Sequence, residues 1–305
     1  MDDSLKQEII KRIQNYESPK RTAFTSKFPF LLKPVIFFRC LIKSIQNILI
    51  FKIKNKKRAD FFEHVIADYR IALRKELTDA DAIRLQENKI TNMKIAAEKI
   101  NGIIIEPGKI FSFWNAVGNP SYKNGYTDGR IYSNVSVVKG VGGGLCQLST
   151  FLYWMFLYTP VKILERHPHT IDVNPSSKEN ISSRSGATVL YNFIDLKIKN
   201  NINCPIQLKI WFTENYLEGQ ILSAEKIKKT FRVIEKNHCF IRKDDKVYQY
   251  NEIYREITED GKPVKTEKII TNFYQVLYDL TDEYVRENGY KVFDYSELIE
   301  PCVTQ

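Results

Sequence analysis

The stretch that decides the fold is Val141–Thr150, VGGGLCQLST. Three consecutive glycines cost conformational entropy, so they are used where the backbone approaches a neighbour closely or takes a positive φ. Apolar residues then recur at the spacing of an α-helix, at Leu148, Phe151, Leu152, Met155 and Phe156. The sequence therefore predicts a glycine loop that leads into a buried helix, with Cys146 on the first turn.

A cysteine at the start of a helix can act as a nucleophile. The positive end of the helix dipole lowers the pKa of a thiol and favours the thiolate. The backbone N–H groups of Gly142, Gly143 and Gly144 can stabilise an oxyanion, and Gln147 is a further candidate for supporting it. The alternative is a small apolar core residue, as free cysteines often are. The segment by itself supports both interpretations equally.

Two of the four histidines follow this helix, at His167 and His169 in Glu165–Thr170. The short β-compatible segment 161–164 precedes them, and alternate residues of a strand point to one side, so both rings can face the same space. The order helix, turn, strand can bring an imidazole back beside Cys146, and a Cys–His pair is the minimal activated nucleophile. An alternative is a zinc site made by Cys146, His167 and His169. The thiol-enzyme interpretation requires no metal and no cofactor.

Six motifs carry a resemblance to a known family: Glu106–Trp114, Gly125–Tyr126, Gly140–Thr150, Glu165–His169, Ala187–Val189 and Ile194–Asn200. On these motifs the chain resembles the VanW family, which is named from a vancomycin-resistance gene cluster, over roughly Asn88 to Ile221. The resemblance implies a cell-wall function and a cysteine L,D-transpeptidase-like activity that transfers acyl groups of peptidoglycan. It implies Cys146 as the nucleophile, His169 as the general base, and a peptidoglycan precursor or stem peptide as the partner.

The chain departs from the family pattern at Gly186, where many relatives carry Asp in a Gly-x-Asp-Ala-Thr-Val motif. If that Asp orients the histidine, Asp195 or Asp172 must replace it here. Loss of the orienting carboxylate of a catalytic triad can cost about 10⁴-fold in rate. The departure therefore leaves open a non-catalytic accessory module that binds a cell-wall precursor or a partner and in which Cys146 is unreactive.

Charge is concentrated in the first fifth of the chain. Residues 1–60 hold 14 Lys and Arg against 5 Asp and Glu, a net charge of +9, whereas the whole chain carries +10. Arg39, Lys43 and Asn47 form a polar stripe in the apolar segment 28–51, and more lysines follow directly. This pattern predicts a helix in an anionic membrane surface, formed by residues 28–58. A helix packed on the core with a solvated edge is the equal alternative, and no nucleic-acid motif is present.

The five cysteines are odd in number and scattered, which is typical of a reducing compartment. The polar start of the chain predicts that no secretory signal peptide is present. We therefore expect a cytoplasmic protein, peripheral at the inner face of the membrane.

Pattern changes predict an α+β fold, with a helix-start cysteine packed on a mostly antiparallel β-sheet, N-terminal helices and a β-rich C-terminal part. The predicted units are a basic amphipathic segment 1–60, a helical segment 61–101, a core domain 102–225 and a C-terminal extension 226–305. Helices are expected at 59–75 and about 90–101, and strands at 103–105, 131–138 and 206–212. Asp260-Gly261 predicts a hairpin turn, and the polar segment 175–186 a rim beside the site.

Overall fold

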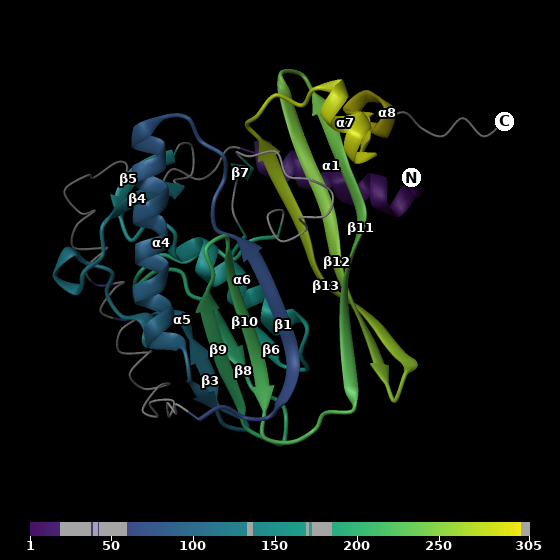
Figure 1. Ribbon diagram of the computed structural model, residues 1–305. Helices are drawn as coiled ribbons and strands as arrows, with labels where there is room; N and C mark the ends of the chain where they lie inside the picture. Colours follow the sequence, from purple (N-terminus) through teal and green to yellow (C-terminus); the bar gives the residue numbers. More distant parts are fainter. Residues whose placement is uncertain are drawn as a thin grey trace.

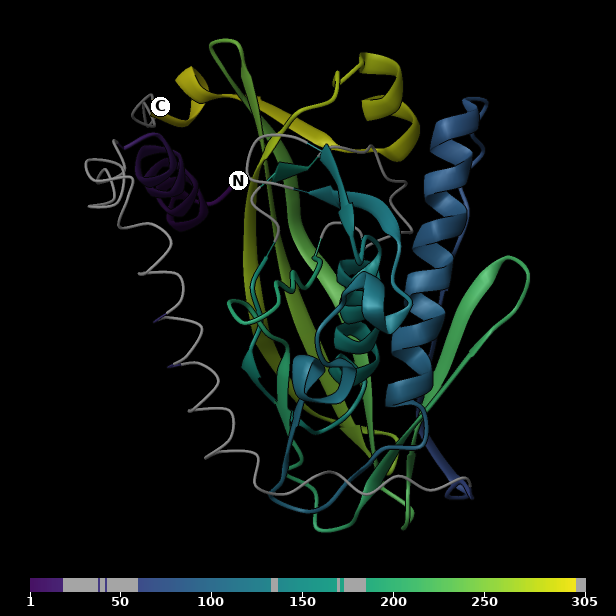
Figure 2. The same ribbon diagram turned by 90° about the vertical axis from the view of Figure 1, so that its left-hand side faces the viewer.

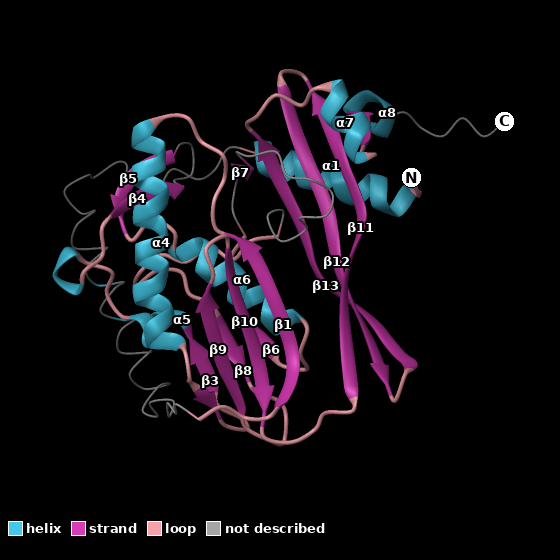
Figure 3. Ribbon diagram, in the orientation of Figure 1, coloured by secondary structure: helices cyan, strands magenta, loops and turns pink. Residues whose placement is uncertain are grey.

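The computed structural model describes residues 1–18, 38, 42, 60–132, 137–168, 171–172 and 185–299. Figure 1 shows a core of sheet and helices beside a long C-terminal sheet. The colouring of Figure 3 shows the strands of both parts. All but two of the strand pairs are antiparallel among the described residues. The predicted α+β class is confirmed.

The core is built on a four-stranded antiparallel sheet in the order β1-β10-β9-β2. Its strands are β1 (His64–Ala72), β2 (Ile104–Ile105), β9 (Ile206–Phe212) and β10 (Tyr216–Ser223). The strands predicted at 103–105 and 206–212 are therefore confirmed. Leu208 and Ile221 of β9 and β10 are fully buried, which places the main core on one face of this sheet.

The helix predicted at 59–75 is wrong, because this segment forms strand β1. Ala67, Tyr69 and Ile71 alternate along it and pack against the core, which is the two-residue period of a strand. The segment is rich in β-branched and aromatic residues, which favour strands. The segment predicted as helical from 61 to 101 therefore begins with a strand that completes the core sheet.

Two helices cover the core sheet. Helix α4 (Ala80–Ile100) begins ten residues earlier than predicted, because the Asp79 side chain caps it by accepting from the Ala82 N–H. It ends at the predicted Asn101-Gly102 signal. Helix α6 (Leu145–Leu157) is the predicted cysteine helix and is buried along almost its whole length.

Helix α6 lies directly on strands β1 and β10 of the core sheet. A Cβ atom added at Gly219 of β10 would lie 2.8 Å from Phe151 Cζ and 3.0 Å from Met155 Sδ. The missing side chain therefore lets the helix approach the sheet closely. The predicted packing of the cysteine helix on an antiparallel sheet is confirmed.

Smaller elements complete the core. A three-stranded sheet consists of β3 (Ile110–Ser112), β8 (Lys197–Lys199) and β6 (Lys162–Glu165), and α5 (Phe113–Val117) and the 3-10 helix η2 (Tyr122–Asn124) follow β3. The single strand predicted at 131–138 is wrong. It is a hairpin of β4 (Asp128–Tyr132) and β5 (Val137–Val141), in which the chain reverses and Ile131 pairs with Val138.

The C-terminal extension forms a five-stranded sheet in the order β14-β11-β12-β13-β7. Its elements are β11 (Lys229–Lys243), β12 (Lys246–Glu259), β13 (Lys262–Val276), β14 (Lys291–Asp294), α7 (Asp282–Asn288) and α8 (Tyr295–Ile299). The predicted turn at Asp260-Gly261 joins β12 to β13 and is confirmed. The fifth strand, β7 (Ile171–Asp172), comes from the segment just after the histidines and pairs parallel to β13.

Helix α1 (Asp3–Glu17) packs on the C-terminal sheet through Ile9 and Ile13. Figure 2 shows α1 and α4 on opposite sides of the molecule. The predicted membrane-surface segment 28–58 lies outside the described residues, apart from Phe38 and Ile42. Within the described part of the chain, no helix combines the length and the apolar character needed to cross a membrane.

Candidate functional site

The glycine loop is held by backbone packing. Gly142 and Gly144 have φ of 81° and 103°, in the region that favours glycine. A Cβ atom on Gly143 would lie 2.5 Å from Gly129 Cα and 2.7 Å from Arg130 N, so the loop touches the backbone of β4 directly. The close approach predicted for the glycines is therefore present, and its partner is the protein itself.

Asn92 of α4 fixes the orientation of this loop, and the sequence analysis missed it. Its side-chain amide donates to Gly143 O and Thr127 O, each at 2.9 Å, and its carbonyl oxygen accepts from Thr127 N at 2.8 Å. Asn92 is fully buried. A signal was available, since it stands seven residues after the buried Leu85 and four before Ala96, where helical periodicity calls for an apolar residue.

Lys89, one turn before Asn92, packs beside the N-terminus of α6. A Cβ atom on Gly144 would lie 2.5 Å from Lys89 Cγ, so the lysine stem touches this glycine. Its Nζ donates to Leu73 O at 2.7 Å. Burial, together with the nearby Lys75 and Arg74, lowers the pKa of Lys89 to about 8. A cation that loses its proton more readily than an ordinary lysine therefore lies next to the glycine loop.

Gln147 donates to Ala72 O at 3.0 Å, so its amide binds the end of β1. In the structure this side chain is therefore engaged with the backbone of β1, and its support of an oxyanion stays a prediction.

Cys146 occupies the second position of α6, as predicted. Its Sγ–H donates to Val189 O at 3.5 Å, on the segment that follows Gly186. Burial raises the pKa of the Cys146 thiol. The pKa is therefore shifted in the direction opposite to that expected from the helix N-terminus, and desolvation by burial is the largest cause.

His167 pairs with the backbone segment that receives the Cys146 thiol. Its carbonyl oxygen accepts from Thr188 N at 2.8 Å, and Val189 O is the next acceptor along. The His167 ring is 46% exposed, and its Nε2 lies 3.4 Å from Glu165 Oε1. Cys146 and His167 are therefore attached to neighbouring residues, 189 and 188, without a hydrogen bond between them among the described contacts.

The predicted general base, His169, lies outside the described residues. Glu165 is the carboxylate that lies beside His167. The sequence analysis considered only Asp195 and Asp172 for this role, although Glu165 opens the motif that contains both histidines. Glu165 also pairs with Lys197 Nζ at 2.8 Å. A carboxylate beside a histidine is the arrangement that orients an imidazole in catalytic sites.

Asp195 is buried in a different setting. It accepts from the Ser112 hydroxyl at 2.5 Å and from Trp114 N at 3.1 Å, which ties it to the start of α5. Burial raises the pKa of the Asp195 carboxyl, although these hydrogen bonds oppose the rise. None of its hydrogen bonds within the described residues reaches a histidine. The side chain of Asp172, the other predicted substitute, is not described.

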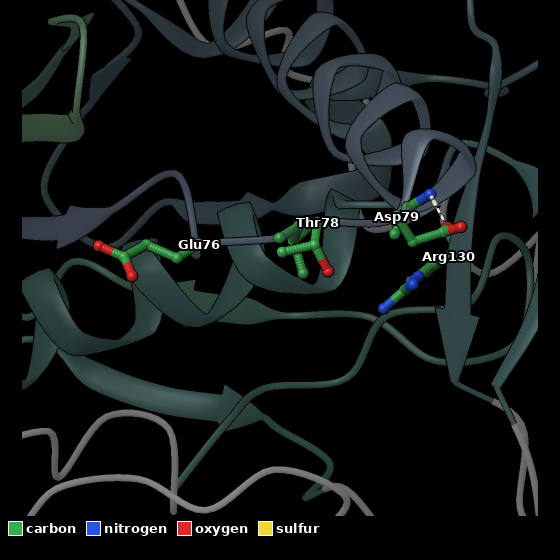
Figure 4. A pocket seen from close by; sticks show the side chains of 6 residues that line it. Glu76, Thr78, Asp79 and Arg130 are labelled. Carbon is green, nitrogen blue, oxygen red and sulfur yellow. Dashed lines mark hydrogen bonds between the residues drawn. The ribbon is translucent and has the colours of Figure 1, made fainter.

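No three His, Cys, Asp or Glu side chains within the described ranges converge closely enough to hold a metal ion. Because His169 is not among them, the zinc site stays a prediction. An open hollow of about 690 Å³ lies beside the N-terminus of α4. In Figure 4 the side chains of Asp79 and Arg130 lie near each other, and Glu76 points away from both. None of the predicted site residues lines this hollow.

Comparison with known proteins matches residues 88–222 to the family described as VanW like protein. The vancomycin B-type resistance protein VanW of Enterococcus faecalis (strain ATCC 700802 / V583) is 30% identical over 199 residues, which is 65% of this chain and 72% of that protein. The uncharacterized protein YoaR of Bacillus subtilis (strain 168) is 27% identical over 153 residues, which is 50% of this chain and 49% of YoaR. No solved structure matches the chain. The extent of the first of these similarities, together with the family match, establishes that the chain belongs to the VanW family.

Proposed function

We propose that this chain is a cell-envelope protein related to vancomycin resistance, in which Cys146 transfers acyl groups of peptidoglycan stem peptides. The printed name of the relative from Enterococcus faecalis supports the first part. Support for the second comes from a cysteine on the first turn of a buried helix, entered through glycines of positive φ. We further propose that the protein acts at the inner face of the membrane, which residues 28–58 contact.

In the proposed reaction the Cys146 sulfur attacks the carbonyl carbon of a stem-peptide amide. The thiol proton passes to the imidazole of His169, with His167 as the other candidate base. The C–N bond then breaks, and the imidazolium proton goes to the leaving amine. An acceptor amine attacks the thioester, gives its proton to the imidazole, and the thiolate recovers that proton when it leaves. Water in place of the amine makes the same step a hydrolysis.

The observation that carries the proposal is the state of the backbone at the helix start. The N–H groups of Gly144 and Cys146 donate to no acceptor in the described part of the chain. Asn92 and the packing of Gly143 on Gly129 fix the peptide groups beside them. Preorganised N–H groups of this kind stabilise the developing oxyanion of acyl transfer.

Trapping the thioester tests the proposal. Native protein is incubated with a synthetic stem peptide, and the intact mass is followed with Cys146→Ala, His169→Ala and His167→Ala alongside. We expect a mass gain at Cys146 that is absent in Cys146→Ala and reduced by about 100-fold or more in rate when the true base is removed. Cys204→Ala is the control, because Cys204 is a free thiol of the core that is more buried than Cys146. An adduct that survives Cys146→Ala, or no adduct with any stem peptide, contradicts the enzyme proposal.

A second candidate function is supported by the raised pKa of Cys146 and its hydrogen bond to Val189 O. Both favour an inert thiol in an accessory module that holds a cell-wall precursor. For that module we expect stem-peptide binding by calorimetry that is unchanged in Cys146→Ala, with no covalent adduct. Binding that disappears together with the thiol is the outcome that argues for the enzyme.

A further inference from the structure

We infer that the C-terminal sheet, whose strands β11 to β14 lie outside residues 88–222 of the family match, is part of the proposed active site. In this inference Asn272 of β13 is a positioning residue that holds the segment carrying His167 against the helix carrying Cys146. The inference rests on the proposed function, since it assigns a role in the same site. It extends that function by making the extension necessary for the site.

The contact between β13 and the core is a buried polar cluster. The Arg166 guanidinium donates from Nε to Gly186 O at 2.8 Å and from Nη2 to Asn272 Oδ1 at 3.1 Å. Asn272 Nδ2 donates to Ser185 Oγ at 3.1 Å. One asparagine therefore holds both Arg166 and Ser185, which are 19 residues apart in the chain.

This cluster joins every segment of the proposed site. Arg166 directly precedes His167, and Ser185 lies four residues before Val189, the acceptor of the Cys146 thiol. The cluster also reaches α6, because Trp154 Nε1 donates to Ser185 O at 3.0 Å and the guanidinium lies 5.3 Å from the Tyr153 ring centroid. A change at Asn272 is thereby passed to the histidine segment and to the cysteine helix together.

Burial makes these bonds consequential. Ser185 is fully buried and Asn272 is 1% exposed. Arg166 Nη1 is buried and has no partner among the described residues. The guanidinium therefore depends on its other two nitrogens, Nε and Nη2, which donate to Gly186 O and Asn272 Oδ1. Leaving a buried polar group without its partner costs more than an average hydrogen bond gains.

A second attachment lies a few residues further along the same strand. Ile171 and Asp172 of β7 pair in parallel with Gln275 and Val276 of β13. Both ends of the segment from Arg166 to Asp172 are therefore attached to one strand, at Asn272 and at 275–276. The position of this strand sets the path of the segment that carries His167.

The test compares two buried asparagines that pair with each other on the neighbouring strands β12 and β13. Asn251 of β12 is the register partner of Asn272 and is also fully buried, but its amide donates to Glu235 rather than to the core. Asn272→Ala and matched Asn251→Ala are made in the full chain. Hydrogen–deuterium exchange is measured for peptides covering 165–168 and 185–190, and the rate of Cys146 alkylation is measured against pH. Asn272→Asp, which keeps an acceptor for Arg166, tests rescue.

We expect Asn272→Ala to speed exchange at the Thr188 amide by about ten-fold, the loss of one hydrogen bond's worth of protection. The pH profile of Cys146 alkylation should become the same as in His167→Ala or His169→Ala, whichever of these two variants changes it. Asn272→Asp should restore most of the exchange protection and most of the alkylation profile. Equal exchange in the Asn272→Ala and Asn251→Ala variants overturns the inference. So does faster exchange with an alkylation profile that stays at the wild-type form.

The exchange result is separate from the proposed chemistry. If Cys146 never forms an acyl adduct, the enzyme proposal fails on its own measurement. Anchoring of residues 165–168 and 185–190 by Asn272, and its effect on the alkylation of Cys146, are still judged by the same two measurements, because neither of them requires an acyl adduct.

Discussion

The cysteine and the histidine segment are fixed to the molecule by different means. The loop before Cys146 is held by backbone against backbone, where Gly143 meets Gly129 with no room for a methyl group. The segment around His167 has one backbone hydrogen bond, from Thr188 N to His167 O, and it is tied to the C-terminal sheet by the side chains of Arg166 and Asn272. The loop before Cys146 is therefore the more rigid of the two regions. The position of the His167 segment also depends on side-chain hydrogen bonds to a second sheet.

Buried polar atoms without a partner among the described residues occur in both regions. Tyr126 Oη and Ser149 Oγ are such atoms in the core, and Gln249 Oε1 and Asn251 Oδ1 are such atoms in the C-terminal sheet. By contrast, both polar atoms of the Asn92 amide have partners. Unpaired buried groups reduce stability, so neither region is free of this cost.

Gly143→Ala is expected to have the largest effect, because it breaks the rigid side of the comparison. Its Cβ would overlap backbone atoms of Gly129 and Arg130, which cannot move as a flexible side chain would. We expect a loss of about 3 kcal/mol or more in the free energy of unfolding, measured by urea denaturation. Gly108→Ala is the control, since a Cβ atom there meets no other atom within 4 Å. Its only cost is the strain of an alanine at a φ of 73°, about 1 kcal/mol. A smaller loss for Gly143→Ala than for Gly108→Ala contradicts the close-packed loop.

Asn92→Ala should rank second. It leaves the Gly143 carbonyl and the Thr127 N–H without their partner, and it leaves the Thr127 carbonyl with one donor, Gly142 N, at an expected cost of about 2–3 kcal/mol. The matched variant in the other region is Asn251→Ala, which loses one hydrogen bond to Glu235 and should cost about 1 kcal/mol. Urea midpoints of the two variants measure the loss of stability in each region. Equal losses would contradict the expected difference between the core and the C-terminal sheet.

Lys89→Met should have the smallest effect and should depend on pH. The folded pKa of about 8 lies below the ordinary value of 10.5, so the unfolded chain binds more protons between these values and stability rises with pH there. Below about pH 8 the cost of burying the cation is fully present. Lys89→Met should therefore be more stable than wild type at pH 7 by about 1 kcal/mol, with the advantage gone near pH 10. An advantage of the same size at both pH values would show that Lys89 is not buried as a cation.

Local features of the sequence predicted the rigid region well. The glycine run, the helical spacing after Cys146 and the alternation of 206–212 depend on neighbouring residues, and each appears in the structure. The apolar residues of segment 64–72 fit the helical period and the strand period equally over so short a length, so a helix was predicted there. The strand forms because the segment pairs with β10, which lies far away in the sequence.

The attachments of the site were beyond local patterns. Asn92 binds a residue 51 positions away, and Arg166 one 106 positions away. Neither distance leaves a periodic trace. The direction of the Cys146 pKa shift was predicted from the helix end alone, whereas desolvation by burial in the folded core raises this pKa. Contacts of this range can be found only once the fold is known.

The docking of α1 on the C-terminal sheet has a consequence for the order of folding. Glu17 accepts from the hydroxyl of Tyr248 at 2.8 Å, across 231 residues of chain, and the apolar face of α1 is covered by residues from 239 onward. During synthesis this helix leaves the ribosome long before its partner exists. Ile9 and Ile13 remain uncovered through the folding of the whole core, and a chaperone or a membrane surface has that interval in which to bind them.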